Sequence, residues 1–599
     1  MKRVALFLAA LALGLALSAC GGGEAYGRIQ VSIVETAGLT VENNGQWIEP
    51  GENAEFLLTV SFGWEISNVL YDGGYRLSAE GGRIRLELLD VRYPLRARVE
   101  LTEAEEPDGQ TSVLRDYRTV TYQPNGGGGK PVAETYRVSV HTRPNTSRGP
   151  DGFAREGYTL TGWNTAPDGS GTAVGLGSRV TVPTEGLTLY AQWQRWTQED
   201  CFDFAAGEDG LRVIGYHGEE DTVVVPGTAA GRPVTAIAAG AFAGCAARRV
   251  VLPPNLAVVD EGAFAGAALE ELTLFDSIET ISDAAFADCA RLRTVHINAA
   301  EDPYGYQYRR ESLYADKVDM LINARGTQKL VFYGGCSMWY NLIGNEAVHA
   351  FPEYTVINMG LNGTVNSLIQ MEILGEFLEE GDILFHAPEL SSAQQLLLDT
   401  GMHSGDDKLW CGLEYNYDLL ALADLREIEG VFDSFAGYLQ KKQPGGSYAD
   451  EYRDASGNVI MDGTGSISLL RIQAQPRLAE TDEVTLDPAC LEGGLPALAR
   501  IYGEYGAKGV RVYFSYACMD RDALPRSQRD NGPEMERRLR ELIGGMDGPA
   551  VISLLEDYFY GTRDFYDTHY HLLTPQAYGN TEKWLRDLAA RMAADGLRP

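Results

Sequence analysis

The chain has little of what would make it an integral membrane protein or a nucleic-acid-binding protein. After residue 20, no apolar run approaches the roughly 20 residues that a bilayer-spanning helix needs, so no later segment is expected to cross a membrane. Basic residues are scarce: 50 Lys and Arg face 84 Asp and Glu, a net charge of −34. Binding to phosphates requires clustered basic residues. No nucleic-acid partner is therefore expected.

Cysteine is also sparse, with eight residues among 599. Seven remain besides Cys20, an odd number without the regular spacing of a disulfide framework. We expect mostly free, buried thiols. The sequence also lacks a P-loop, a dinucleotide-binding glycine fingerprint and paired Cys/His spacing for zinc. Neither a metal nor a nucleotide cofactor is expected.

The N-terminus carries the features of an export signal. Lys2 and Arg3 precede an apolar run over residues 4–17, which is typical of a signal peptide. The run ends in Leu-Ser-Ala-Cys at residues 17–20, which resembles the lipobox of bacterial lipoproteins. The resemblance implies cleavage before Cys20, lipidation of its sulfur and anchoring at the outer face of the cytoplasmic membrane. An ordinary secretory signal with an incidental cysteine is the alternative.

Five segments follow the signal peptide of residues 1–20, beginning with a tether and a β domain. Glycines at 21–23 predict a flexible tether over residues 21–25. Residues 26–105 alternate apolar and polar positions between Asn/Gly turns, which predicts an all-β domain of unknown role. Strands are expected at residues 28–34, 55–60, 82–89 and 96–101.

Residues 118–194 contain three conspicuous phrases. They are Val-Thr-Tyr-Gln-Pro-Asn-Gly-Gly at 120–127, Gly-Tyr-Thr-Leu-Thr-Gly-Trp-Asn-Thr at 157–165 and Leu-Tyr-Ala-Gln-Trp at 189–193. Together they resemble the Listeria-Bacteroides repeat of internalin-type surface proteins. The resemblance implies a small β-grasp-like module for spacing or adhesion, in which the two Trp residues supply most of the core.

Residues 200–300 contain an internal repeat. Ala-Phe phrases begin at residues 241, 263 and 285, a period of 22, and each precedes a short apolar strand. A fixed period with one strand per repeat predicts a leucine-rich-repeat solenoid, and the phrase resembles the BspA type. Cys245 and Cys289 lie two repeats apart, roughly 10 Å at strand spacing, which is too far for a disulfide. So short a solenoid needs caps, which the flanking domains are expected to supply.

Residues 303–599 alternate apolar strands with helical patterns, which predicts an α/β domain with a parallel sheet. The expected strands are residues 329–333, 355–358, 382–386, 510–515 and 550–554, with helices at 367–378 and 533–543 among others. Ligands bind beyond the carboxyl ends of such strands. The residues that follow each strand are therefore the candidates for chemistry.

The first strand runs into Tyr-Gly-Gly-Cys-Ser-Met-Trp at residues 333–339. A glycine turn that delivers a nucleophile directly after a strand is typical of serine hydrolases. This turn resembles the Gly-Asp-Ser block of SGNH (GDSL-like) hydrolases, which have a three-layer, flavodoxin-like fold. Two registers fit. Ser337 is preferred because the family uses serine, while the length of the strand favours Cys336.

The second and third strands lead to the predicted oxyanion site. Residues 357–364 resemble the second family block, which implies that the backbone N–H of Gly363 binds the oxyanion, with Asn362 and Gly360 as second choices. The family usually has Gly-x-Asn-Asp after the third strand, and its Asn is a second oxyanion donor. This chain has Ala-Pro-Glu at 387–389 instead, as in a branch of surface-associated relatives.

The last block lies near the C-terminus, where Asp567 and His571 resemble the Asp/His pair that completes the family's catalytic triad. In that role Asp567 would orient the imidazole, and His571 would take the proton of the nucleophile. The spacing is one residue longer than the usual Asp-x-x-His, and the use of His569 would make it shorter.

These features favour a lipid-anchored surface enzyme that hydrolyses or transfers O-acyl groups on glycans or wall polymers, without a cofactor. The alternative is an adhesion or scaffold protein whose SGNH-like domain is inactive and whose repeats contact cell-wall glycan or another cell surface. A sugar-binding module that uses Trp339, Tyr340 and Trp410 is a third hypothesis.

Overall fold

The structure is a computed structural model, and it describes most of the folded segments of the chain. The described residues are 28–34, 39–60, 64–71, 75–80, 83–91, 95–103, 117–137, 152–176, 180, 182–183, 186–298, 313–361, 366–390, 408–413, 417–441, 463–466, 486, 495–546 and 548–598. Cys20 and the tether lie outside them. Among the described residues, no helix combines the length and apolar character needed to cross a membrane.

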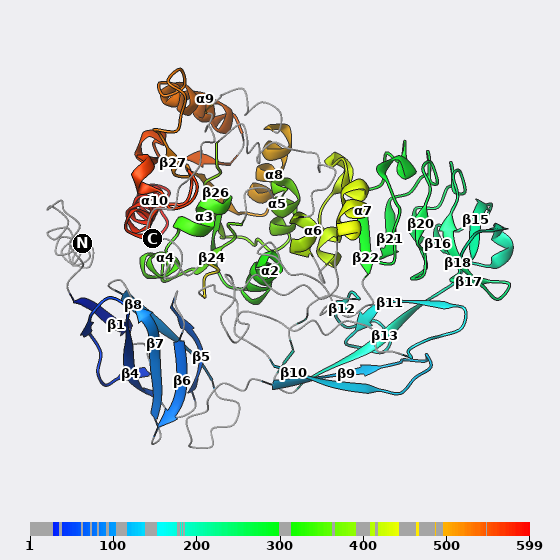
Figure 1. Cartoon of the computed structure of the whole chain (residues 1–599), viewed down its shortest axis with the longest axis horizontal. Coiled ribbons are helices and arrows are strands. Elements are labelled where there is room, and N and C mark those ends of the chain that lie inside the picture. The colour runs from blue at the N-terminus through cyan, green and yellow to red at the C-terminus, as the bar shows by residue number, and fades with distance from the viewer. Residues whose placement is uncertain are drawn as a thin grey trace. The chain divides into compact units, whose positions relative to one another are not determined.

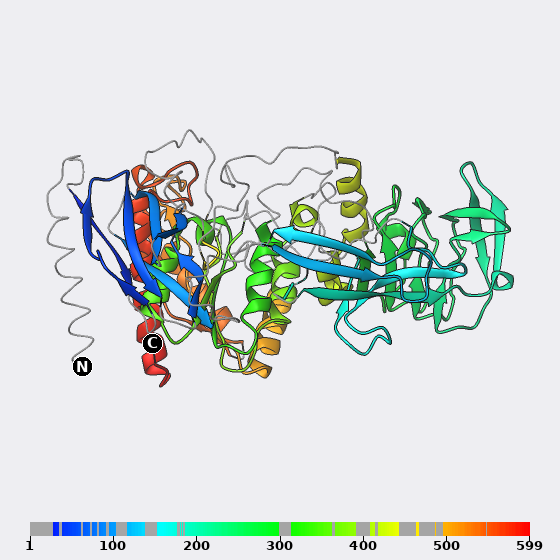
Figure 2. The same cartoon turned by 90° about the horizontal axis from the view of Figure 1, so that it is seen from below.

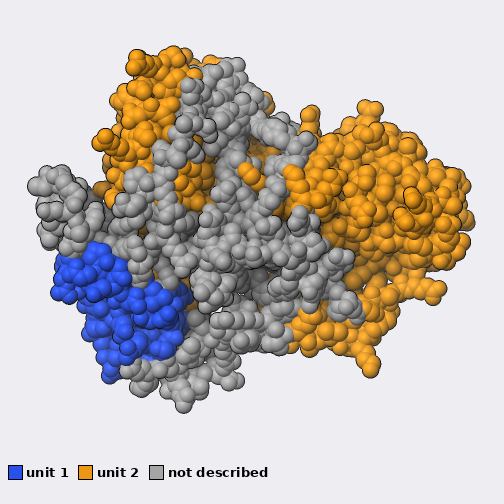
Figure 3. Space-filling model, in the orientation of Figure 1, with its two compact units in different colours: residues 1–66, 73–113 blue, residues 67–72, 114–599 orange. Residues whose placement is uncertain are grey.

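The chain divides into two compact units, which Figure 3 colours separately: residues 1–66 with 73–113, and residues 67–72 with 114–599. The first eight strands of the chain form two four-stranded sheets, ordered β3-β1-β8-β5 and β2-β4-β7-β6. Alternate side chains of β4 are buried, as the alternating sequence pattern predicts. The strands are β1 (Ile29–Val34), β2 (Leu39–Val41), β3 (Gln46–Ile48), β4 (Glu52–Val60), β5 (Trp64–Leu70), β6 (Tyr75–Glu80), β7 (Arg83–Val91) and β8 (Leu95–Glu103).

A five-stranded sheet follows, ordered β10-β9-β13-β11-β12. Its strands are β9 (Tyr117–Gln123), β10 (Val132–Arg137), β11 (Tyr158–Asn164), β12 (Ala173–Val174) and β13 (Leu187–Arg195). Trp163 is fully buried in its small core, against Tyr122. Trp193 is only partly buried, and its indole N–H donates to the Pro124 carbonyl. Gly127 is required here, because a Cβ at this position would lie 2.5 Å from the Trp193 ring.

The solenoid is a parallel ladder of four short strands, ordered β16-β19-β21-β22. Figures 1 and 2 show its strands side by side. The region contains η1 (Glu199–Cys201), β14 (Phe202–Ala206), β15 (Leu211–Tyr216), β16 (Thr222–Val224), β17 (Thr228–Ala229), β18 (Arg232–Ile237), β19 (Arg249–Val251), β20 (Val258–Val259), β21 (Glu271–Phe275), η2 (Asp283–Phe286) and β22 (Thr294–Asn298).

The repeated phenylalanines stack on one another inside the solenoid. Phe242 lies 4.9 Å from Phe264, and Phe264 lies 5.3 Å from Phe286, between ring centroids. The stack is closed at both ends by aromatic residues of other elements: Tyr216 of β15 and Phe432 of the C-terminal domain, 4.2 Å from Phe286. The C-terminal domain therefore caps the last repeat, as expected of so short a solenoid.

The C-terminal domain is built on an all-parallel sheet, ordered β24-β23-β25-β26-β28. Counted within the domain, this is the 2-1-3-4-5 order of flavodoxin-like folds. Its strands are β23 (Lys329–Tyr333), β24 (Thr355–Asn358), β25 (Ile383–His386), β26 (Arg511–Phe514) and β28 (Ala550–Val551). β23 and β25 are buried on both faces, since helices cover each side.

Helices α3, α4 and α10 pack together on one side of this sheet, and α5 and α8 pair on the other (Figure 1). The helices are α2 (Leu313–Asn323), α3 (Cys336–Asn341), α4 (Gly344–Ala350), α5 (Ser367–Gly375), α6 (Lys408–Leu413), α7 (Val431–Lys441), α8 (Leu495–Ala507), α9 (Gly532–Gly544) and α10 (Thr574–Ala594). Short elements complete the domain: β27 (Met519–Asp520), β29 (Phe559–Tyr560), η6 (Tyr417–Leu422), η7 (Leu425–Glu427), η11 (Leu555–Tyr558) and η12 (Thr562–Asp564).

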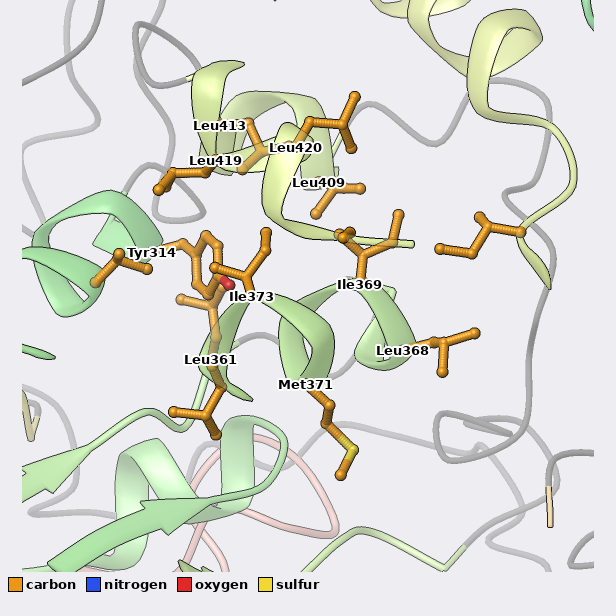
Figure 4. Close-up of a cluster of buried hydrophobic side chains, with 14 of the residues drawn as sticks. Tyr314, Leu361, Leu368, Ile369, Met371, Ile373, Leu409, Leu413, Leu419 and Leu420 are labelled. Atoms are coloured by element: carbon orange, nitrogen blue, oxygen red, sulfur yellow. The ribbon is translucent and has the colours of Figure 1, made fainter. Parts of the chain in front are cut away.

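Figure 4 shows why α5 is buried around most of its circumference. Leu368, Ile369, Met371 and Ile373 point in different directions: Ile369 and Ile373 point toward leucines of α6 and η6, whereas Met371 points to the opposite side of the helix. The nearly continuous apolar sequence of α5 reflects this setting, because a helix that is hydrophobic all round belongs in a core. The helix ends at Gly375, three residues earlier than its pattern predicted.

The described cysteines are free thiols, as expected. Only Cys411 and Cys518 are fully buried, so the expectation that most would be buried was wrong for the described residues. Cys245 and Cys289 are partly exposed on the solenoid, where burial raises the pKa of each thiol.

Candidate active site

The candidate site lies where the order of the parallel sheet reverses. From β23 the chain passes to β24 on one side and then to β25 on the other. The carboxyl ends of β23 and β25 therefore lie at the switch point, which is the usual ligand site in such sheets. Cys336 and Ser337 follow β23, and Glu389 follows β25. These are the residues that meet there.

Glu389 packs directly on the turn that carries the predicted nucleophile. Its carboxylate oxygen Oε1 accepts the backbone N–H of Ser337 at 2.7 Å and the thiol of Cys336 at 3.4 Å. Gly335 makes this approach possible, because a Cβ there would lie 2.7 Å from the carboxyl carbon and both its oxygens. The absence of a side chain at Gly335 therefore leaves the space that the Glu389 carboxyl group occupies.

Cys336 and Ser337 differ in accessibility. Cys336 is partly exposed, whereas Ser337 is fully buried. The Ser337 hydroxyl finds no hydrogen-bond partner among the described residues, although the Cys518 thiol is close enough to interact with it. The Ser337 N–H is also occupied by Glu389, so it is not available to an oxyanion. The geometry favours the register in which Cys336 is the nucleophile.

The His571 ring is held in a defined orientation. Its Nδ1 lies 2.7 Å from Asp567 Oδ1, and the ring stacks on Tyr340 with centroids 3.8 Å apart and planes at 7°. The ring is 6% exposed, and its Nε2 finds no hydrogen-bond partner among the described residues. With Asp567 accepting from Nδ1–H, the neutral imidazole presents Nε2 as a base.

Asn341, at the end of α3, ties this helix to the loop that carries His571. Its side-chain amide donates to the Tyr570 carbonyl at 2.7 Å, and its Oδ1 accepts the Leu572 N–H at 2.9 Å. Thr581 of α10 donates its hydroxyl proton to the Asn341 carbonyl and accepts the Ile343 N–H. A segment more than 200 residues away is thereby fixed beside the helix that begins at Cys336.

Glu389 contacts Cys336 and is close enough to His571 for their charges to interact. Burial raises the pKa of its carboxyl, while the Ser337 N–H, His571 and the Cys336 thiol lower it by smaller amounts. The Cys518 thiol also faces it, and the pKa of that thiol is raised well above its ordinary value, mainly by burial. Cys336 and His571 therefore interact with one and the same carboxyl group.

The loop after β24 is held by a buried network. Lys317 of α2 is fully buried and donates to the carbonyls of Asn358, Gly360 and Gly465 at 2.6 to 2.8 Å. The Asn358 side chain accepts the Gly360 N–H at 2.8 Å and donates to the Met338 carbonyl. The Gly360 N–H is thus occupied, which disfavours its predicted oxyanion role.

Comparison with known proteins identifies the two repeat regions. Residues 229–312 match the BspA-type leucine-rich-repeat region in six copies, and residues 119–192 match the Listeria-Bacteroides repeat domain. The chain contains both modules. Both repeat types are typical of bacterial surface proteins.

Two proteins of Evansella cellulosilytica are similar to short stretches of the chain. One, named "Putative Gly-rich membrane protein", is 36% identical over 74 residues, 12% of this chain and 9% of that protein. The other, named "Putative membrane protein", is 39% identical over 66 residues, 11% of this chain and 10% of that protein. The chain thus spans about a tenth of the length of these relatives.

Among solved structures, a leucine-rich-repeat protein of T. pallidum is 24% identical, covering 17% of this chain and 71% of that protein, with a TM-score of 0.12.

The predicted site residues fall into three groups. Cys336 and Ser337 contact Glu389, the charge of His571 acts on the same carboxyl group, and Asp567 contacts His571. Gly363 and Asn362 lie outside the described residues, as does Cys20. His569 pairs with the buried Asp520 at 2.9 Å rather than with Asp567, so it belongs to a separate pair.

The aromatic residues proposed for sugar binding are core residues instead. Trp339, Tyr340 and Trp410 are each at most 3% exposed. Trp410 packs on Phe435 and donates to the Ser434 hydroxyl. They offer no open face for a sugar ring.

Sequence reasoning missed the supporting residues Glu389, Asn341 and Lys317. In the sequence, Glu389 stands out only as a departure from the family pattern. Lys317 stands alone as a cation in the apolar pattern of α2, and this isolation is the signal that could have identified it.

Proposed function

We propose that the C-terminal domain is an acyl hydrolase or acyl transferase that uses Cys336 as its nucleophile, His571 as its general base and Asp567 to orient His571. The observation that carries the proposal is the arrangement around Glu389. The partly exposed thiol of Cys336 contacts the Glu389 carboxyl group, and the charge of His571 acts on the same group. Asp567 orients the His571 ring, whose Nε2 has no hydrogen-bond partner among the described residues. This arrangement lies at the sheet edge where ligands bind.

The chemistry would run in two steps. His571 Nε2 takes the thiol proton as the Cys336 sulfur attacks the acyl carbonyl carbon, and the carbonyl oxygen becomes an oxyanion. The ester C–O bond then breaks, and His571 returns the proton to the departing alkoxide. The resulting thioester is cleaved by water in hydrolysis, or by a substrate hydroxyl in acyl transfer; His571 accepts the proton of the attacking oxygen and returns it to the departing Cys336 sulfur as the C–S bond breaks.

The resemblance to SGNH hydrolases supports O-acyl groups on glycans or wall polymers as the substrate class. The lipobox-like sequence supports lipidation at Cys20 and a location at the outer face of the cytoplasmic membrane. The repeat modules, which are typical of surface proteins, fit that location. The repeats would contact cell-wall glycan or a neighbouring cell surface.

The test is acetate release from an O-acetylated wall polymer and from p-nitrophenyl acetate by the purified chain. Cys336→Ala is expected to lower kcat/KM by about a thousandfold or more, and Ser337→Ala by less than about tenfold. Cys245→Ala removes a comparable, partly exposed thiol from the solenoid and serves as the control. Iodoacetamide should inactivate the wild type and label the peptide that contains Cys336.

Two outcomes would change the assignment. A large loss in Ser337→Ala, with Cys336→Ala active, would move the nucleophile to Ser337. A wild type without turnover, indistinguishable from Cys336→Ala and His571→Ala on both substrates, would favour the non-catalytic adhesion or scaffold role that the repeat modules suggest.

A further inference from the structure

The oxyanion site of the proposed enzyme lacks one hydrogen-bond donor that SGNH hydrolases have. SGNH hydrolases place an Asn after the third strand of the sheet as a side-chain donor, and this chain has no Asn there. Glu389 stands in that place instead, three residues after the end of β25. An ionised carboxylate could only accept hydrogen bonds and would repel an oxyanion.

The contacts of Glu389 determine where a proton on its carboxyl group would lie. Oε1 already accepts from the Ser337 N–H and the Cys336 thiol. Oε2 is buried and has no hydrogen-bond partner among the described residues. A proton on a neutral carboxyl would therefore sit on Oε2, which would then be a donor without an acceptor.

We infer that Glu389 acts as a neutral carboxylic acid and donates from Oε2 to the acyl oxygen, as the side-chain oxyanion donor of the reaction. This inference rests on the proposed acyl-transfer function. The group is anchored to the nucleophile turn through Oε1, so its donor is held beside the carbon that Cys336 attacks. A preorganised donor of this kind contributes about 10²- to 10³-fold to kcat.

The surroundings favour the neutral form. Glu389 is 2% exposed, and burial is the largest influence on its pKa, which is raised. The titratable groups that face it among the described residues are Cys336 on α3, His571 before α10 and Cys518 after β26. Of these, a positively charged His571 and the Cys336 thiol both oppose the neutral form, as does the Ser337 N–H, and the influence of each is smaller than that of burial.

The decisive comparison is Glu389→Gln with Glu389→Ala in the full chain. A glutamine keeps the shape, accepts through its oxygen and donates permanently through its NH₂. Glu389→Gln should therefore retain kcat within about tenfold, whereas Glu389→Ala should lose about 10²-fold or more. If Glu389→Gln loses as much as Glu389→Ala, the carboxylate is needed in its charged form and the inference is overturned.

The pH profile provides a readout that a purely structural role would not move. A carboxyl with a raised pKa stays neutral to higher pH and then ionises, so kcat of the wild type should fall as pH rises through that pKa. Glu389→Gln should lack this fall. A wild-type chain without any turnover contradicts the proposed function, whereas an active wild type with the same profile as Glu389→Gln contradicts the role of Glu389 alone.

Discussion

Lys317 is the residue on which the loop after β24 depends most directly. Its ammonium group satisfies three backbone carbonyls from two chain segments far apart in sequence, and none of it is exposed to solvent. Removal of the charge would leave these carbonyls buried and deprived of a donor. An unsatisfied buried polar group costs about 1 to 3 kcal/mol.

We therefore expect Lys317→Met, which preserves the length of the side chain, to destabilise the C-terminal domain by about 3 kcal/mol or more. Calorimetry of the full chain would measure the shift of the transition that contains this domain. Lys508→Met is the matched control: that ammonium group also donates to a backbone carbonyl, of Gly375, but its side chain is 40% exposed. An equal shift in both variants would contradict the role given to Lys317.

Asp567 is a second residue whose effect can be isolated. Its carboxylate is 38% exposed and contacts Nδ1 of a nearly buried imidazole. Asp567→Asn preserves the shape and lets the wrong ring nitrogen carry the proton, so kcat should fall by about 10³- to 10⁴-fold with little change in thermal stability. Esterase kinetics and a melting curve on the same preparation check both parts. Unchanged kcat would remove Asp567 from the proposed triad.

The sequence predicted residue types at the site better than it predicted their arrangement. Gly334, Gly335 and the Asp/His pair could be located because each directly follows a strand or precedes a helix. Glu389 could not be assigned a role, since its position over Gly335 depends on the contact between two parallel strands, β23 and β25. Local patterns do not encode such contacts.

At the scale of elements, the junction between the solenoid and α7 is built from a reciprocal pair of carboxylates. Asp283 of η2 accepts the backbone N–H groups of Gly430, Phe432 and Asp433 at the start of α7. Asp433 accepts the N–H of Asp283 in return, at 3.1 Å. Asp283 thus caps the N-terminus of a helix that belongs to another domain.

Loss of this cap should loosen the junction. Asp283→Ala is expected to destabilise the chain by about 1 to 2 kcal/mol and to increase proteolytic cleavage near η2 and the start of α7. Asp283→Asn retains an acceptor oxygen and should lie closer to the wild type. Limited proteolysis with mass mapping of the fragments would measure the effect. Identical fragment patterns in all three proteins would show that the cap contributes little.

Most elements of the C-terminal sheet followed from sequence periodicity. β23 and β24 begin and end at the predicted residues, because buried parallel strands read as short apolar runs bounded by turns. β28 is shorter than predicted: pairing with β26 stops at Val551, although the apolar run continues. The cap on the solenoid was expected from its shortness, but the residues that form it could not be named from the sequence.

At the scale of the whole molecule, the solenoid and the C-terminal domain share one hydrophobic core. Buried residues from Phe202 through Phe286 to Met592 form a single cluster. The stacked phenylalanines continue across the junction through Phe432. The solenoid and the C-terminal domain therefore fold against each other, and we expect the proposed active site to be held wherever the solenoid is held.

The expected location at the membrane can be tested at Cys20. If Cys20 is lipidated, the chain expressed in a bacterial host with the lipoprotein pathway should incorporate an alkyne-labelled fatty acid and partition with the membrane fraction. A single acyl chain binds membranes only marginally, but a lipoprotein N-terminus carrying several chains would be held firmly. Cys20→Ala should lose the label and shift to the soluble fraction or remain uncleaved, while Cys245→Ala should behave as the wild type. Equal labelling of Cys20→Ala and wild type would rule out the anchor and leave an ordinary secretory signal.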